Sequence, residues 1–69
     1  MPLTMLKSGE EKSIKKVGGK EETRQFLAKL GLFPGSHVTV VNEIGGNVIV
    51  NIKESRVAVS REMAAKIMV

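Results

Sequence analysis

The stretch FLAKLGLFPG, residues 26–35, carries the clearest structural signal in this sequence. It starts as a helix, and Gly31 directly follows the last apolar residue of the helical pattern. A glycine at this position is typical of a left-handed residue that ends a helix. Leu32 is then placed to fold back on the helix, and Pro34 and Gly35 prevent the helix from continuing. The stretch therefore predicts a helix end followed by a turn.

The helix itself is expected to span Lys20 to Leu30. At about 100° per residue, one face collects the side chains expected to be buried, which are Thr23, Phe26, Leu27 and Leu30. The residues outside this face are Arg24, Gln25, Ala28 and Lys29. Glu21 and Glu22 in the first turn, and Lys29 in the last, suit the helix dipole. The segment is therefore predicted to be an amphipathic helix.

The segment before this helix predicts one short turn and one strand. Residues 3–6 read as coil or a 3₁₀ turn that lays apolar side chains on the body of the protein. Residues 11–17 read as a strand, but Ile14 and Val17 are three apart, and strict alternation would send them to opposite faces. A bulge or bend near Lys15-Lys16 would bring both side chains to one face.

After the helix, the hydrophobic period changes from 3.6 to two. Gly45-Gly46 separates two alternating segments and predicts a β-hairpin, and Glu54-Ser55 predicts a second turn. Val38 and Val40 are expected on one face of the first segment, and Val48, Val50 and Ile52 on a shared face of the second. Val57 and Val59 continue the alternation. Ser60 is placed to cap a final short helix whose buried side would contain Met63, Ala64, Ile67 and Met68. The predicted order, β-α-β-β-β-α, favours a mainly β fold closed into a small barrel.

Composition restricts the class of protein. The chain has 69 residues, 42% of them hydrophobic, a formal net charge of +4 and no cysteine. One small domain over residues 1–69 is expected, without disulfides, thiolate metal clusters or redox chemistry. No apolar stretch is long enough to span a bilayer or resembles a signal peptide, so a cytoplasmic location is expected. Two Phe and no Trp or Tyr leave little stacking surface and disfavour RNA binding.

Catalytic groups are scarce in this sequence. His37 is the only histidine, and no Ser-His-Asp set or phosphate-binding motif accompanies it. We therefore expect a protein that is not an enzyme and needs no cofactor. His37 is a weak candidate for metal binding, because the only partners available to it are carboxylates such as Glu43, Glu54 and Glu62.

Two features favour a protein-binding surface. Leu32 and Phe33 stand beside the Pro-Gly turn, where two large apolar side chains are difficult to bury together, and an exposed Phe is a common interface anchor. The chain also carries a group of basic residues at Lys12, Lys15, Lys16, Lys20 and Arg24. Acidic residues are interspersed among them, so this group is read either as a solvated face or as a docking surface.

The stretch TRQFLAKLGLFPG, residues 23–35, followed by the valine-rich strand, resembles the FeoA family, the small cytosolic component of bacterial ferrous iron transport. The flanks agree with this resemblance. Leu3, Leu6 and Ser8-Gly9 resemble the leucine pair and turn at the start of the family, and residues 57–67 resemble its closing strand and helix. The resemblance covers almost the whole chain and is most specific over residues 27–35.

The resemblance implies an SH3-like β-barrel with one helix inserted after the first strand and a short C-terminal helix. It also implies a non-enzymatic accessory protein that docks on the cytosolic GTP-binding region of the FeoB permease and modulates iron uptake. Contact with the membrane would be indirect, through FeoB. The fold also resembles the C-terminal SH3-like domain of metal-dependent repressors, so a metal-responsive regulatory module is one alternative. A nucleic-acid-binding module is another, because small SH3-like barrels host that activity and the chain is basic.

The expected contact surface surrounds the helix end. Phe33 and Leu32 would form the apolar anchor, and basic side chains would form the rim that attracts an acidic partner. The residues expected to bind the partner are Lys20, Arg24, Leu27, Lys29, Leu30, Leu32 and Phe33. The same surface would also allow the chain to form a homodimer.

Overall fold

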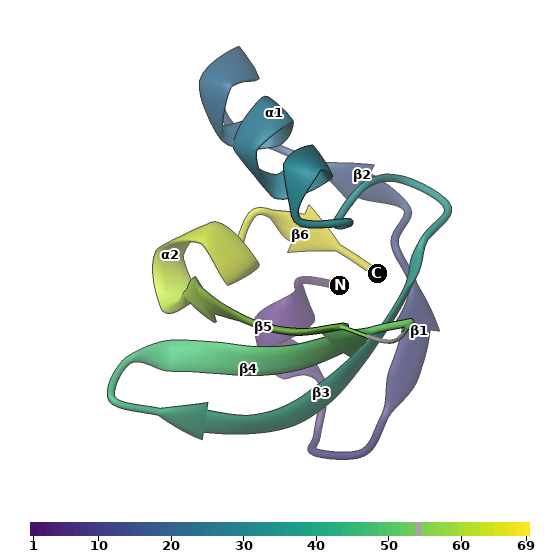
Figure 1. Cartoon of the computed structure of the whole chain (residues 1–69), viewed down its shortest axis with the longest axis vertical. Helices are drawn as coiled ribbons and strands as arrows, with labels where there is room; N and C mark the ends of the chain where they lie inside the picture. The colour runs from purple at the N-terminus through teal and green to yellow at the C-terminus, as the bar shows by residue number, and fades with distance from the viewer. Residues whose placement is uncertain (54) are drawn as a thin grey trace.

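The computed structural model describes residues 1–53 and 55–69, and strands are its main type of secondary structure (Figure 1). The elements in chain order are η1 (Leu3–Met5), β1 (Glu11–Ser13), β2 (Lys16–Val17), α1 (Glu21–Lys29), β3 (His37–Ile44), β4 (Asn47–Ile52), β5 (Ser55–Ser60), α2 (Arg61–Ala64) and β6 (Ile67–Met68). One sheet has the strand order β1-β3-β4-β5, and β2 pairs with β6 in a second. All of these pairings are antiparallel. The mainly β prediction is confirmed.

The β3–β4 hairpin forms where the sequence predicted it. Ile44 pairs with Asn47, so Gly45 and Gly46 are the two turn residues, with φ of 55° and 82°. Positive φ at both positions gives the turn twist that matches the twist of the strands, and glycine adopts it without a Cβ clash. The alternating valines are buried as expected, but the pairing shifts register between Val40 and Asn42, a bulge that alternation did not predict.

The segment 11–17 is two strands and not the single bulged strand that was predicted. β1 pairs with β3, whereas β2 pairs with β6. At the break, the Ile14 N–H donates to the Ser36 carbonyl (2.8 Å) and the Lys15 N–H donates to the Met68 carbonyl (2.8 Å). The chain therefore changes sheets at this point, and this lets Ile14 and Val17 both point into the core.

The C-terminal segment corrects the prediction of a longer helix. Ser60 caps α2 as expected, because its hydroxyl accepts a hydrogen bond from the Met63 N–H (3.2 Å). The helix ends at Ala64, and Ile67 and Met68 form β6 instead of a further turn. Pairing with β2 satisfies their backbone polar groups and buries Ile67, which outweighs the local helical pattern.

The core lies between the two sheets, α2 and the buried side of α1. Its buried hydrophobic residues are Leu3, Leu6, Ile14, Val17, Leu27, Leu32, Val38, Val40, Val48, Val50, Ile52, Val59, Ala64, Ile67 and Val69. Leu3, the first residue of η1, and Leu6, which follows it, are buried as predicted, whereas Met5 is exposed. The chain ends lie side by side (Figure 1), and the Val69 N–H donates to the Met1 carbonyl (2.7 Å).

The second predicted turn, Glu54-Ser55, is described only in part. Ser55 begins β5 and pairs with Ile52, and Glu54 lies outside the described residues. Lys53, on the other side of the turn, has a φ of 54°. Across the part of the chain that the structure describes, every helix is too short or too polar to cross a membrane.

Candidate functional site

The candidate site is built on the end of α1. Gly31 follows the C-cap residue Leu30 with a φ of 97°, and its N–H donates to the Ala28 carbonyl (3.0 Å). The Leu32 N–H donates to the Leu27 carbonyl (2.9 Å). These two bonds form a Schellman motif, in which a left-handed glycine reverses the chain and satisfies the last helix carbonyls. The predicted cap at Gly31 is confirmed.

The turn that follows holds Phe33 in a fixed position. The Ser36 hydroxyl donates to the Phe33 carbonyl (2.8 Å) and accepts from the Phe33 N–H (3.3 Å). The Gly35 N–H donates to the Ile14 carbonyl (2.8 Å), which joins the turn to the break between β1 and β2. The N–H and the carbonyl of Phe33 are therefore both hydrogen-bonded to the Ser36 side chain, while 44% of the residue stays exposed.

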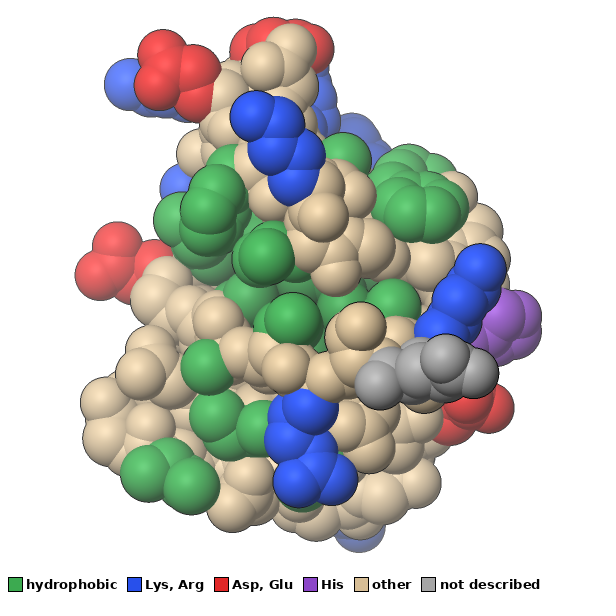
Figure 2. Space-filling view, in the orientation of Figure 1, with side chains coloured by type: hydrophobic (Ala, Val, Ile, Leu, Met, Phe, Trp, Pro, Cys, Tyr) green, Lys and Arg blue, Asp and Glu red, His purple; other side chains and the backbone are tan. Residues whose placement is uncertain are grey.

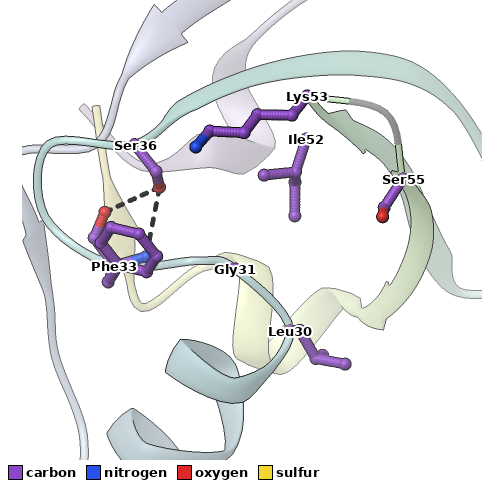
Figure 3. Close-up of a pocket in the computed structure, with 7 residues that line it drawn as sticks. All are labelled: Leu30, Gly31, Phe33, Ser36, Ile52, Lys53 and Ser55. Carbon is purple, nitrogen blue, oxygen red and sulfur yellow. Dashed lines mark hydrogen bonds between the residues drawn. The ribbon is translucent and has the colours of Figure 1, made fainter.

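One pocket of about 390 Å³ lies on one side of Phe33, between the helix end and the β4–β5 turn (Figure 3). Its lining residues are Leu30, Gly31, Phe33, Ser36, Ile52, Lys53 and Ser55. Ile52 points from β4 into this space, and Lys53 runs across it toward the side of Ser36 and Phe33 (Figure 3). The pocket therefore has an apolar floor and a cationic side chain that runs across it.

A second hollow of about 260 Å³ lies against the opposite flank of α1. Its lining residues are Val17, Glu21, Arg24, Gln25, Ala28, Leu32, Phe33 and Pro34. Arg24 forms an ion pair with Glu21 and also donates to the Gly19 carbonyl (3.0 Å). Phe33 lines both hollows, so the two hollows lie next to this residue.

The structure corrects two of the expected contact residues. Leu27 and Leu32 are both 0% exposed and belong to the core. A side chain without accessible surface cannot touch a partner unless the fold opens, so the contact role predicted for them is wrong. Leu32 is buried because the Schellman motif turns it back under the helix, which is the packing expected beside such a cap.

The remaining expected contact residues do reach the surface. Lys20, Arg24 and Lys29 are exposed on α1 and its N-cap, and Leu30 is partly buried against the core. Phe26, which the helical pattern placed on the buried face, is 49% exposed. It lies about 100° around the helix from Leu27, at the margin of the buried face.

Sequence reasoning missed Ile52, Lys53 and Ser55 as residues of the site. They come from the β4–β5 hairpin, about twenty positions along the chain from the helix end. No local pattern links the two segments, because only the folding of the sheet brings them together. Lys53 has a left-handed backbone conformation. The sequence does not predict it, because lysine is not one of the residues that favour such a turn position.

The weak metal candidate His37 is exposed at the start of β3. Glu43 lies at the far end of the same strand, where it forms an ion pair with Arg61 (2.5 Å). Glu62 is exposed on α2, and Glu54 lies outside the described residues. Within residues 1–53 and 55–69, no three His, Cys, Asp or Glu side chains come together as a metal-binding group.

Known proteins share both the sequence and this fold. The FeoA domain family matches residues 1–69. A protein of Methanocaldococcus jannaschii, named as an Fe(2+) transport protein A, is 38% identical over 68 residues, which cover 99% of this chain and 83% of that protein.

Among solved structures, FeoA from Chlorobium tepidum superposes with a TM-score of 0.90 and 26% identity, covering 99% of this chain and 67% of the other. FeoA from Stenotrophomonas maltophilia, solved with zinc and described as a procaryotic SH3 domain protein, superposes with a TM-score of 0.82. Its identity is 22%, over 99% of this chain and 87% of the other.

These likenesses define an SH3-like domain with a helix inserted ahead of its main hairpin, and they confirm the predicted fold. The chain belongs to the FeoA family, whose members are accessory proteins of ferrous iron transport.

Proposed function

We propose that residues 1–69 act as one non-enzymatic module that docks on the cytosolic GTP-binding region of the FeoB permease and modulates ferrous iron uptake. The module would work in the cytoplasm and meet the membrane only through FeoB. The observation that carries the proposal is the position of Phe33, an exposed aromatic ring on a hydrogen-bonded turn between two hollows.

This position suits an interface anchor for two reasons. A half-exposed aromatic ring gains apolar burial when a partner covers it, and the residues that dominate binding energy are often aromatic. The Ser36 hydrogen bonds already hold the backbone of Phe33 in place. Little conformational freedom is therefore lost on binding, and this favours affinity.

Exposed basic side chains on α1 provide a polar rim. Lys20 and Lys29 lie near its two ends, and Arg24 lies between them as one partner of the Glu21 ion pair. With a net charge of +4, the chain attracts an acidic partner over long distances, which raises the association rate more than the affinity. Of the three, Arg24 is expected to contribute least, because Glu21 already offsets its charge.

The test is an NMR titration of the isotope-labelled chain with the soluble cytosolic domain of FeoB, with and without guanine nucleotide. Phe33→Ala is compared with Phe26→Ala, which removes an equally exposed ring that lines neither hollow. We expect Phe33→Ala to keep the fold and weaken binding by roughly 1 to 3 kcal/mol. Phe26→Ala should leave affinity within about threefold of the parent.

Equal losses of affinity in the two variants would show that Phe33 is not the anchor, and the absence of any shift with FeoB would refute the proposal.

An RNA oligomer serves as the comparison ligand. Binding through phosphates weakens steeply as salt rises, whereas a contact centred on an apolar anchor changes little. Salt-sensitive shifts with RNA and none with FeoB would favour the nucleic-acid-binding alternative.

A further inference from the structure

Lys53 has an unfavourable backbone conformation that glycine would tolerate better. Its φ is 54°, in the left-handed region where a Cβ atom is crowded. The other residues with positive φ in the described chain are all glycines, namely Gly9, Gly19, Gly31, Gly35, Gly45 and Gly46. A lysine at the one remaining left-handed position suggests that its side chain has a use that offsets the strain.

The side chain of Lys53 lines the 390 Å³ pocket. It crosses the pocket toward the turn that holds Phe33, above the apolar side chain of Ile52 (Figure 3). Figure 2 shows hydrophobic side chains gathered between α1 and β5, with basic side chains around this apolar area. Among the described residues, no carboxylate oxygen lies within 4.0 Å of the Lys53 ammonium group.

We infer that this pocket binds an acidic peptide segment of the partner, which inserts one apolar side chain between Leu30, Phe33 and Ile52 and places a neighbouring carboxylate against Lys53. The inference rests on the proposed function and identifies the chemistry that its docking site recognises. The pocket volume is near the lower end of the range for ligand sites, about 300 to 1,000 Å³. That space suits one or two side chains better than a large cofactor.

Charge complementarity selects an acidic peptide over the other occupants of such a pocket. A second copy of this chain also carries a net charge of +4 and its own Lys53, so a symmetric contact would bring like charges together. A nucleic acid would satisfy the ammonium group with phosphate but would leave the apolar floor uncovered. An acidic peptide with apolar side chains matches both parts of the pocket.

The decisive variant is Lys53→Asn, because asparagine tolerates the left-handed conformation and carries no charge. The control is Lys7→Asn, which removes the same charge from an exposed residue that does not line the pocket. The probes are the acetylated, amidated peptide Glu-Leu-Glu-Leu, its neutral counterpart Gln-Leu-Gln-Leu, and the FeoB cytosolic domain. Binding is followed by NMR, and Tm by thermal unfolding.

We expect the acidic peptide to shift the resonances of Leu30, Phe33, Ile52 and Lys53 and to bind Lys53→Asn about two- to fivefold more weakly. Lys7→Asn should bind the acidic peptide about as tightly as the parent does. The affinity of the neutral peptide should be about the same for Lys53→Asn and the parent. The Tm of Lys53→Asn should equal or exceed that of the parent, because strain is relieved. A lower Tm together with unchanged peptide affinity would assign Lys53 a structural role and overturn the inference.

Further outcomes separate this inference from the proposed function. If the FeoB domain binds in a Phe33-dependent way, but Lys53→Asn weakens binding of neither the acidic peptide nor the FeoB domain, the pocket inference fails and docking stands. If the acidic peptide occupies the pocket and the FeoB domain does not bind, the pocket inference stands and the choice of partner fails. Pocket resonances that shift on dilution without peptide would indicate a second copy as the occupant and overturn the inference.

Discussion

Leu32 and Phe33 are adjacent apolar residues with opposite roles. Leu32 is fully buried, whereas Phe33 is 44% exposed. The difference arises from the Schellman motif, which directs the residue after Gly31 under the helix and leaves the next one outside. The sequence showed that burying both would be difficult, and the cap geometry decided which of them became the surface residue.

Gly31→Ala should destabilise the protein for two reasons. The positive φ of 97° strains any residue with a Cβ, and that Cβ would lie 3.3 Å from the Ile52 Cγ2 atom. We expect the free energy of unfolding to fall by more than about 1 kcal/mol, measured by urea denaturation. Gly9→Ala is the matched control, because its φ is 89° and no atom lies within 4 Å of its Cβ position. Equal losses in the two variants would exclude the Ile52 contact as a contributor.

At the scale of elements, the C-terminal segment shows how tertiary pairing overrides a local pattern. Met63, Ala64, Ile67 and Met68 have helical spacing, but the helix ends at Ala64. Ile67 and Met68 alternate between buried and exposed as strand residues do, and they pair with β2. The partner strand lies about fifty residues earlier in the chain, so a local pattern contains no information about it.

The Ser60 cap determines where α2 begins, and its loss should be measurable. Ser60→Ala removes the hydroxyl that accepts the Met63 N–H, and we expect the free energy of unfolding to fall by about 1 kcal/mol in urea denaturation. Ser60→Asp keeps an acceptor at the N-terminal end of the helix and should preserve most of the stability. If both variants lose the same amount, the cap is not the source of the effect.

At the scale of the whole molecule, the last three residues complete the core. Ile67 and Val69 are buried, and Val69 pairs with Met1. A chain of this size has little stability in reserve. Deleting residues 67–69 should therefore abolish cooperative folding, seen as lost dispersion in amide NMR spectra. Met68→Ser, a substitution at the exposed residue of β6, should keep the spectrum dispersed. A shortened chain that stays folded would show that β2 does not need β6.

The sequence by itself determined the features that depend on neighbouring residues: the helix, its glycine cap, the Gly45-Gly46 hairpin and the Ser60 cap. These follow from hydrophobic period and from the few residue types that fit each turn or cap. Only the tertiary structure decided the break between β1 and β2, strand β6 and the pocket that joins the helix end to Lys53. Each of these features depends on contacts between segments far apart in the chain. The free energy of forming such contacts is determined by packing and backbone pairing across the whole fold, which a local sequence pattern does not contain.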